Sequence, residues 1–235
     1  FKGGSVASAH GVRRADLLVE GEKVVSLGRG LKAEAERIID VTGCVLFPGF
    51  IDAHTHFDLE VAGTVTADGF TSGSRAALRG GTTTIIDFAC PNKGESLASG
   101  LGRWREKAGG RTFCDYGFHM TIDDWNEHIR QELSEMFFQG ISSFKLYMTY
   151  PAMRLEDRDL YWALKELKAL GGICGVHCEN AGVIDGMIAE KKAAGELSPA
   201  SHPQTRPPYL EAEAVSRLLR IAQAAEAPVI IVHLT

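Results

Sequence analysis

The sequence predicts an α/β protein: an incomplete (β/α)8 TIM-type barrel, with about six βα units present, that follows a short N-terminal β unit. Two observations predict this fold. After residue 45, β-rich runs alternate with segments of helical character at intervals of about thirty residues, and parallel strands need crossover connections of this kind. In addition, histidines and a lysine fall in or directly after several of these runs, where a barrel would gather them.

The sequence of residues 1–46 predicts short strands. The stretch ADLLVEGEKVVSLG alternates between apolar and polar residues around a turn signal at Glu20-Gly21-Glu22, which is typical of a β-hairpin. The rhythm changes from Val45 onward. We therefore expect a small β unit over residues 1–46 and a barrel domain over residues 47–235.

The barrel prediction depends on six strand-like runs and the segments between them. The runs are VLFPGFIDAH, TTTIIDFA, CDYGFHMTI, SSFKLYMT, ICGVHCE and PVIIVHLT. Helical character is found over residues 72–79, 97–107, 125–138, 155–170 and 211–224. This alternation alone fits either a (β/α)8 barrel or an open doubly wound sheet.

The stretch GFIDAHTHFD places two histidines one residue apart. Side chains alternate along a strand, so His54 and His56 are expected on one face, with Asp52 and Asp58 in register. The apolar residues and the Pro-Gly pair before them predict a buried strand that leaves a core. Two imidazoles at the end of such a strand can hold one divalent metal ion.

Three more residues, Lys145, His177 and His233, are expected near His54 and His56 only if the fold is a barrel. Lys145 lies in an apolar run, where an ammonium group must reach solvent, pair with an anion or lose its charge. His177 and His233 could each be a core histidine bonded to the backbone. A barrel brings the ends of its strands to one mouth, whereas an open sheet scatters them, so the shared chemistry of these positions favours the barrel.

The other four histidines are expected to have no role in such a site. His119 lies within a strand-like run and is predicted to be structural. His10, His128 and His202 are predicted to lie on the surface or in loops.

Composition narrows the classes of partner. The 235 residues carry a formal net charge of −5 with dispersed Lys and Arg, which argues against nucleic acid and favours small substrates. No apolar stretch approaches the roughly 20 residues of a membrane span, and no signal-peptide pattern is present, so a cytoplasmic protein is expected. The five cysteines contain no C-x-x-C and predict reduced thiols.

Five motifs in order closely resemble the dihydropyrimidinase and D-hydantoinase family of the amidohydrolase superfamily: PGFIDAHTHFD, GGTTTIIDFA, SSFKLYMTY, GVHCEN and VIIVHLT. The resemblance covers essentially the whole chain. It implies that residues 1–46 belong to a small β-sandwich domain beside the barrel. It also implies five metal ligands, namely His54, His56, Lys145, His177 and His233.

The resemblance further implies a binuclear site with two Zn²⁺ ions, bridged by a carboxylated Lys145 and a hydroxide. The substrate would be a cyclic amide or imide, such as a dihydropyrimidine or a hydantoin, whose ring C–N bond is hydrolysed. Tyr150 matches the tyrosine that binds the substrate and donates to the developing oxyanion; the alternative is an aromatic residue that only packs at the mouth. The full-length protein would be a homo-oligomer, a dimer or a tetramer.

Two features set limits on this interpretation. Dihydroorotases carry an arginine two residues after the second histidine, and this chain has Asp58 there. The chain also stops at Thr235, before the seventh strand and the aspartate that the family's mechanism needs, so we expect a fragment or a truncated copy whose 235 residues are inactive alone. The alternative function is a non-catalytic scaffold or assembly protein on the same fold.

Overall fold

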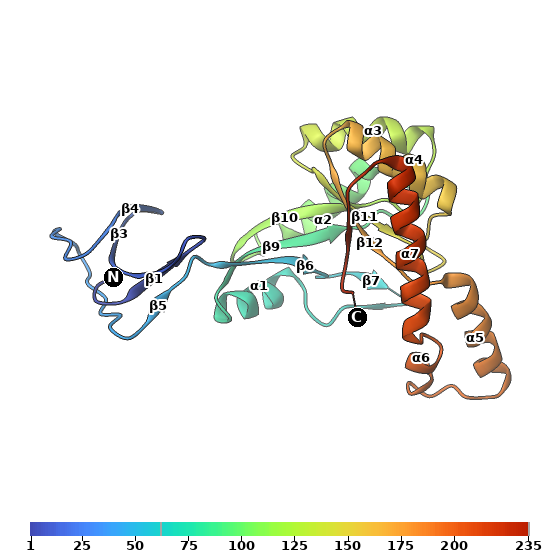
Figure 1. The fold of residues 1–235 in the computed structure, drawn as a ribbon, viewed down its shortest axis with the longest axis horizontal. Helices are drawn as coiled ribbons and strands as arrows, with labels where there is room; N and C mark the ends of the chain where they lie inside the picture. The colour runs from blue at the N-terminus through green and yellow to red at the C-terminus, as the bar shows by residue number, and fades with distance from the viewer. Residues whose placement is uncertain (62, 235) are drawn as a thin grey trace.

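The computed structural model describes residues 1–61 and 63–234. Figure 1 shows a group of N-terminal strands set apart from a larger α/β unit, with the chain between β5 and β6 joining the two. The predicted functional residues all lie in the α/β unit.

The N-terminal group contains two small sheets. One has the strand order β2-β1-β5 and the other is the hairpin β3-β4. Gly21 lies between β3 and β4 with a φ of 58°, a conformation that glycine adopts without strain, and the predicted hairpin is confirmed. The strands are β1 (Ser5–Ser8), β2 (Gly11–Arg14), β3 (Asp16–Glu20), β4 (Lys23–Gly28) and β5 (Val45–Leu46).

A six-stranded parallel sheet forms the α/β unit, in the order β13-β12-β11-β10-β9-β6. Each strand lies beside its predecessor in the chain, so every crossover runs in the same direction. A doubly wound sheet reverses its strand order partway, whereas a barrel does not. The order therefore confirms the barrel prediction, with six of its strands present. They are β6 (Phe50–Thr55), β9 (Thr82–Ala89), β10 (Asp115–Thr121), β11 (Ser143–Tyr147), β12 (Ile173–His177) and β13 (Val229–Ile231).

The five helices predicted from the sequence are present, with bounds that differ from the predicted ones by at most three residues. They are α1 (Phe70–Arg79), α2 (Leu97–Ala108), α3 (Glu127–Phe138), α4 (Asp157–Ala169) and α7 (Pro208–Ala225). Side-chain caps explain two of the starts: Ser96 accepts from the amide of Ser99, and Asn126 accepts from the amide of Ile129. No helix in the described part of the chain is both long and apolar enough to cross a membrane.

Four elements escaped the sequence analysis. The helices α5 (Ala181–Ala193) and α6 (Ser201–Gln204) and the hairpin β7 (Glu60–Val61) and β8 (Thr64–Val65) carry no strong apolar period. In α5 only Ala181 and Ile184 are buried. Figure 1 shows α5 and α6 extending away from the sheet, which explains why they need little apolar surface.

The core lies between the sheet and the helices that cover it. Leu133 of α3, Leu160 of α4 and Leu218 of α7 are fully buried against sheet residues such as Met120 and Leu146. All five cysteines are free thiols, as expected, although Cys44 is exposed in the N-terminal group.

The first predicted strand differs from the structure. The run VLFPGFIDAH forms two separate strands, β5 and β6. Pro48 lies between them and has no amide hydrogen to donate, so the segment between the strands does not continue a β-ladder. The expectation of a buried strand is wrong for β6, in which Phe50 is 54% and Ile51 is 65% exposed. The reason is its place at the edge of the described sheet, where it pairs with β9 alone.

Candidate metal centre

The first histidine pair lies at the end of β6. The rings of His54 and His56 are 5.1 Å apart, centroid to centroid, and both pack on the ring of Phe88, at 4.7 and 4.9 Å. Their predicted proximity is thus present in the fold. Phe88 forms an apolar support that limits the positions open to the two imidazoles.

Both imidazoles of this pair are held in the neutral form. Burial lowers the pKa of His54 and of His56 to about 4, and the neighbouring Lys145 contributes in the same direction. The Nδ1 atom of His56 is buried and has no hydrogen-bond partner among the described residues. A neutral imidazole with a free, buried nitrogen is the form that binds a metal ion.

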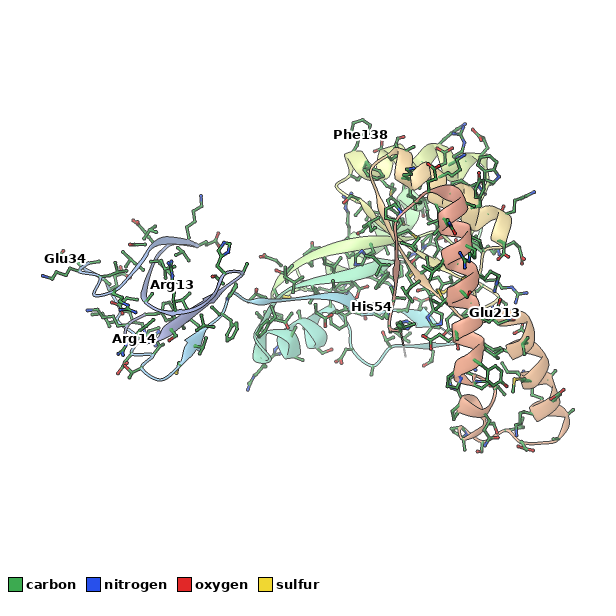
Figure 2. All side chains as sticks on the ribbon, in the orientation of Figure 1. Arg13, Arg14, Glu34, His54, Phe138 and Glu213 are labelled. Carbon is green, nitrogen blue, oxygen red and sulfur yellow. The ribbon has the colours of Figure 1, made fainter. Side chains whose placement is uncertain are left out.

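The second pair faces the first. The Nδ1 atom of His177, at the end of β12, lies 3.1 Å from the Nε2 atom of His233, which follows β13. His233 is also 5.6 Å from His54, ring to ring, and Figure 2 shows His54 beside this C-terminal segment. The fold therefore brings together histidines that are 179 positions apart in sequence, from 54 to 233.

Glu179 orients His177, and sequence reasoning missed this residue. Its Oε2 atom lies 2.9 Å from Nε2 of His177, while Arg206 lies 3.5 Å from its other oxygen. The hydrogen bond from His177 lowers the pKa of Glu179. A carboxylate only accepts, so Nε2 of His177 carries a proton and, in the neutral ring, Nδ1 presents a lone pair to His233. A carboxylate behind a histidine is the usual support of a metal ligand, and the spacing H-x-E in GVHCEN was the available signal.

Lys145 lies in β11 and is only 1% exposed. Its Nζ atom sits 5.1 Å from the ring centre of Phe88 and 4.6 Å from that of Tyr147. It makes no ion pair with a carboxylate of the described residues. Burial lowers the pKa of the amine to about 8, which makes the neutral form of Lys145 more accessible than that of an exposed lysine.

Tyr150 lies at the mouth, and Asp58 does not. Tyr150 is 39% exposed, and its ring lies 5.2 Å from the ring of His177. Burial raises the pKa of its hydroxyl, which stays protonated and able to donate. Asp58 was expected in register with the histidines, but its carboxylate accepts from the amide of Phe70 at the start of α1. The strand register shifts between Asp52 and Thr55, which breaks the simple alternation.

The other four histidines lie within the sheet or on the surface, as predicted. His119 makes two hydrogen bonds inside the sheet, to Ala53 and Ser143. The remaining three, His10, His128 and His202, are exposed.

The structure brings the predicted ligands together as two histidine pairs and one lysine. In the described part of the chain, no three His, Cys, Asp or Glu side chains already surround one position. Instead, two pairs of histidines lie near the buried amine of Lys145. The unpartnered Nδ1 of His56 and the lone pair of His177 that faces His233 are what such ligands require.

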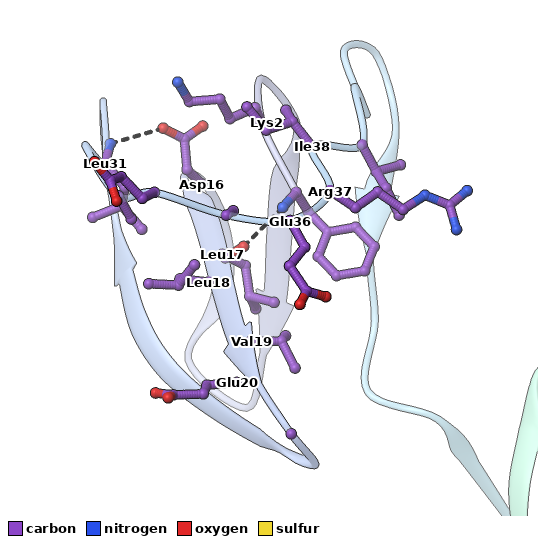
Figure 3. A pocket seen from close by; sticks show the side chains of 16 residues that line it. Lys2, Asp16, Leu17, Leu18, Val19, Glu20, Leu31, Glu36, Arg37 and Ile38 are labelled. Atoms are coloured by element: carbon purple, nitrogen blue, oxygen red, sulfur yellow. Dashed lines mark hydrogen bonds between the residues drawn. The ribbon is translucent and has the colours of Figure 1, made fainter.

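The histidines border a cavity of about 370 Å³ inside the curved sheet, lined by His54, His119 and His233 with apolar residues below them. A second cavity, of about 520 Å³, lies in the N-terminal group (Figure 3). That cavity is lined by Asp16, Leu17, Leu18 and the segment 31–39, where Asp16 accepts from the amide of Leu31. None of the predicted site residues lies there.

Comparison with known proteins shows similarity to one family of enzymes along the whole chain. Residues 45–223 match the amidohydrolase family. The D-hydantoinase of Geobacillus stearothermophilus is 41% identical over 237 residues, which are 100% of this chain and 50% of that protein. The dihydropyrimidinase of Rattus norvegicus is 37% identical over 240 residues, covering 99% of this chain and 46% of its own.

Solved structures agree. The dihydropyrimidinase from Brevibacillus agri superimposes with a TM-score of 0.96 at 42% identity, over 99% of this chain and 51% of that one. The L-hydantoinase from Arthrobacter aurescens gives a TM-score of 0.82 at 27% identity, over 98% and 51%. The chain spans about half the length of these relatives and corresponds to their N-terminal half. The chain belongs to the amidohydrolase family, and the D-hydantoinases and dihydropyrimidinases are proteins to which it is similar.

Proposed function

We propose that the complete protein carrying these residues is a zinc-dependent cyclic amidohydrolase. It would open the ring C–N bond of a cyclic amide or imide, such as a dihydropyrimidine or a hydantoin. The observation that carries the proposal is the Lys145 amine, buried without an anionic partner between the pair His54 and His56 and the pair His177 and His233. The names of the relatives, D-hydantoinase and dihydropyrimidinase, support the substrate class.

Carboxylation would resolve the cost of burying Lys145. The neutral amine attacks carbon dioxide, an N–C bond forms and one proton leaves to water, so the product is an anionic carbamate. The pKa of about 8 makes the neutral amine accessible near neutral pH. The carbamate has two oxygens, and these can serve one ion each.

In this proposal His54 and His56 would hold one zinc ion, His177 and His233 would hold the second, and the carbamate of Lys145 would serve as a ligand of both. When bound, two zinc ions supply a water of lowered pKa as nucleophile and polarise the carbonyl that it attacks. Glu179 keeps the proton of His177 on Nε2, and thereby keeps Nδ1 free to bind.

Tyr150 binds the substrate and donates its hydroxyl proton to the oxygen that becomes negative as the carbonyl is attacked. Its position supports this role, because the ring lies next to His177 and is partly exposed at the mouth. Tyr150 lies shortly after the end of β11 and has a left-handed backbone conformation, with a φ of 65°. Such a strained conformation is often found at functional sites.

Further parts of the proposal concern the whole protein. Residues 1–46 would be part of a small β-sandwich domain and residues 47–235 part of the barrel domain. The protein would act in the cytoplasm as a homodimer or homotetramer. A polypeptide of these 235 residues alone would be inactive.

The test is metal content together with hydrolysis, measured on the complete natural polypeptide that carries residues 1–235. About two zinc ions per chain, and ring opening of dihydrouracil or hydantoin that a chelator abolishes and zinc restores, would support the proposal. The alternative, a non-catalytic scaffold on the same fold, predicts no bound metal and no ring opening. A protein that is metal-free after expression with zinc and bicarbonate would overturn the enzyme proposal.

A further inference from the structure

The segment that carries His54 and His56 is only partly held by the sheet. Its ladder with β9 pairs Asp52 with Ile85 and Thr55 with Asp87, and the register shifts between these two pairs. Ala53 and His54 therefore have no regular partner in the ladder. The other side of β6 pairs with no strand in the described sheet. Something other than the ladder must fix the main chain here.

His119 holds this segment on the N-terminal side of His54. Its Nε2 atom lies 2.9 Å from the carbonyl oxygen of Ala53. A carbonyl only accepts, so Nε2 of His119 carries the proton. The Nδ1 atom then accepts from the hydroxyl of Ser143, at 2.6 Å, which locks that tautomer. His119 thus reaches across β9 to the residue before His54.

Asp87 holds the segment on both sides of His56. Its Oδ2 atom accepts from the hydroxyl of Thr55 and from the amide of Phe57, each at 2.8 Å. Its Oδ1 atom accepts from the amide of Phe88 at 2.8 Å and from Nε1 of Trp104 at 3.0 Å. The carboxylate is fully buried. Burying a carboxylate is costly, and here four donors satisfy it, two of which belong to the residues that flank His56.

Phe88 occupies the space between the two contacts. Its ring packs on His54, His56 and His119, with centroid distances of 4.7, 4.9 and 4.8 Å. Because Phe88 directly follows Asp87 in β9, its amide is held by the same carboxylate. The carboxylate of Asp87 therefore holds both Phe88, on which the two imidazoles pack, and the main chain on either side of His56.

We propose that Asp87 and His119 are positioning residues that fix the main chain around His54 and His56, so that both imidazoles stand ready to bind one metal ion. The inference rests on the proposed function for the role of the two histidines. The hold on the main chain does not depend on bound metal, so it can be measured separately.

The experiment uses the complete polypeptide, stripped of metal, with the variants Asp87→Asn, Thr55→Val, His119→Phe and His119→Gln. An asparagine places an NH2 group against two donors, whichever way its amide faces. Thr55→Val removes one donor while leaving the carboxylate in place, and provides a milder variant should Asp87→Asn fail to fold. Phenylalanine keeps the ring of residue 119 against Phe88 without its donor, whereas glutamine keeps a donor at a similar reach. Leu133→Ala is the matched control, since Leu133 is equally buried but lies in α3.

Two readouts separate positioning from general stability. The first is hydrogen exchange of the Phe57 amide in the metal-free protein, compared with that of core amides. The second is the affinity for Co²⁺ and its visible absorption spectrum, which report ligand geometry. We expect Asp87→Asn to speed Phe57 exchange about tenfold or more. We expect His119→Phe to weaken metal binding about 10- to 100-fold, with glutamine restoring most of it.

The proposal is overturned if Phe57 exchange in Asp87→Asn and Thr55→Val follows the core amides, as it should in Leu133→Ala. It is equally overturned if His119→Phe and His119→Gln bind Co²⁺ alike with an unaltered spectrum. A wild-type protein that binds no metal would instead refute the proposed function, while accelerated Phe57 exchange in the variants would still establish the hold on the main chain.

Discussion

The Nδ1 atom of His177 lies 3.1 Å from the Nε2 atom of His233, while the opposite nitrogen of His177 lies 2.9 Å from the carboxylate of Glu179. One ring thus joins a carboxylate to a second histidine. A carboxylate that fixes the tautomer of a histidine leaves the other nitrogen free as a ligand. Whatever this site binds, the side of His177 that faces His233 is the side prepared for it.

Removing the charge of Glu179 should weaken metal binding. In Glu179→Gln the amide can still contact His177, but it no longer stabilises one tautomer strongly. We expect a loss of metal affinity of about 10- to 100-fold, with a smaller effect on the fold. Competition with a chelator measures the affinity. Glu127→Gln, at the exposed start of α3, is the control and should bind metal like the wild type.

Lys145→Ala should abolish metal binding and ring opening in the complete protein, because it removes the group that would bridge the two histidine pairs. Short carboxylic acids should restore part of the activity by taking the place of the carbamate. Carbon-13 NMR after growth with labelled bicarbonate should detect a carbamate in the wild type but not in the variant. Lys165→Ala, which changes an exposed residue of α4, is the control and should leave metal binding, ring opening and the carbamate signal unchanged. A plain amine on Lys145 in a fully metal-loaded protein would contradict the expectation.

Tyr150→Phe should lower turnover by roughly 10- to 1,000-fold with metal content unchanged, as expected when one donor to a developing oxyanion is lost. Steady-state kinetics with metal analysis of the same sample provides the test. Tyr161→Phe, on α4, is the matched control and should leave turnover as it is. Equal kinetics of Tyr150→Phe and wild type would reduce Tyr150 to an aromatic residue that packs at the mouth.

Asp123 should make stability depend on pH. It is 5% exposed, and burial raises its pKa from 3.8 to about 6. The folded state therefore holds the proton more tightly than the unfolded chain, so this contribution to stability is present below pH 4 and is lost as the pH rises through about 6. Asp123→Asn, neutral throughout, should gain up to about 3 kcal/mol over the wild type at pH 7 and almost nothing at pH 3.5. Urea unfolding across this range tests it, and a constant difference between the two proteins would count against it.

A polypeptide of residues 1–235 alone should not hydrolyse dihydrouracil or hydantoin, even with zinc and bicarbonate present. Both outer strands of its sheet, β6 and β13, would leave main-chain donors and acceptors unpaired, and such edges promote aggregation. Apolar side chains are exposed along them: Phe50 is 54% and Ile230 is 51% exposed. Light scattering and an activity assay decide the matter. A monodisperse 235-residue protein with zinc-dependent ring opening would refute this prediction.

The sequence by itself predicted the alternation of strands and helices and indicated which residues to expect in the candidate centre. Apolar runs mark strands because a buried parallel strand must be apolar on both faces, and a histidine or lysine that ends such a run is conspicuous. Local patterns also predicted that His119 is structural. They could not decide between a barrel and an open sheet, since that choice depends on which strands lie side by side.

Only the tertiary structure decided the environment of these residues. The strand order brings His177 beside His233, and the turn after β12 places Glu179 behind His177, contacts that no local period encodes. The register of β6 shifts between Asp52 and Thr55, and Asp58 accepts a hydrogen bond from the first turn of α1 instead of facing the histidines. The main chain around His54 and His56 is hydrogen-bonded to His119 and Asp87. Burial then lowered the pKa of Lys145, because desolvation depends on the surrounding atoms and not on the neighbours in sequence.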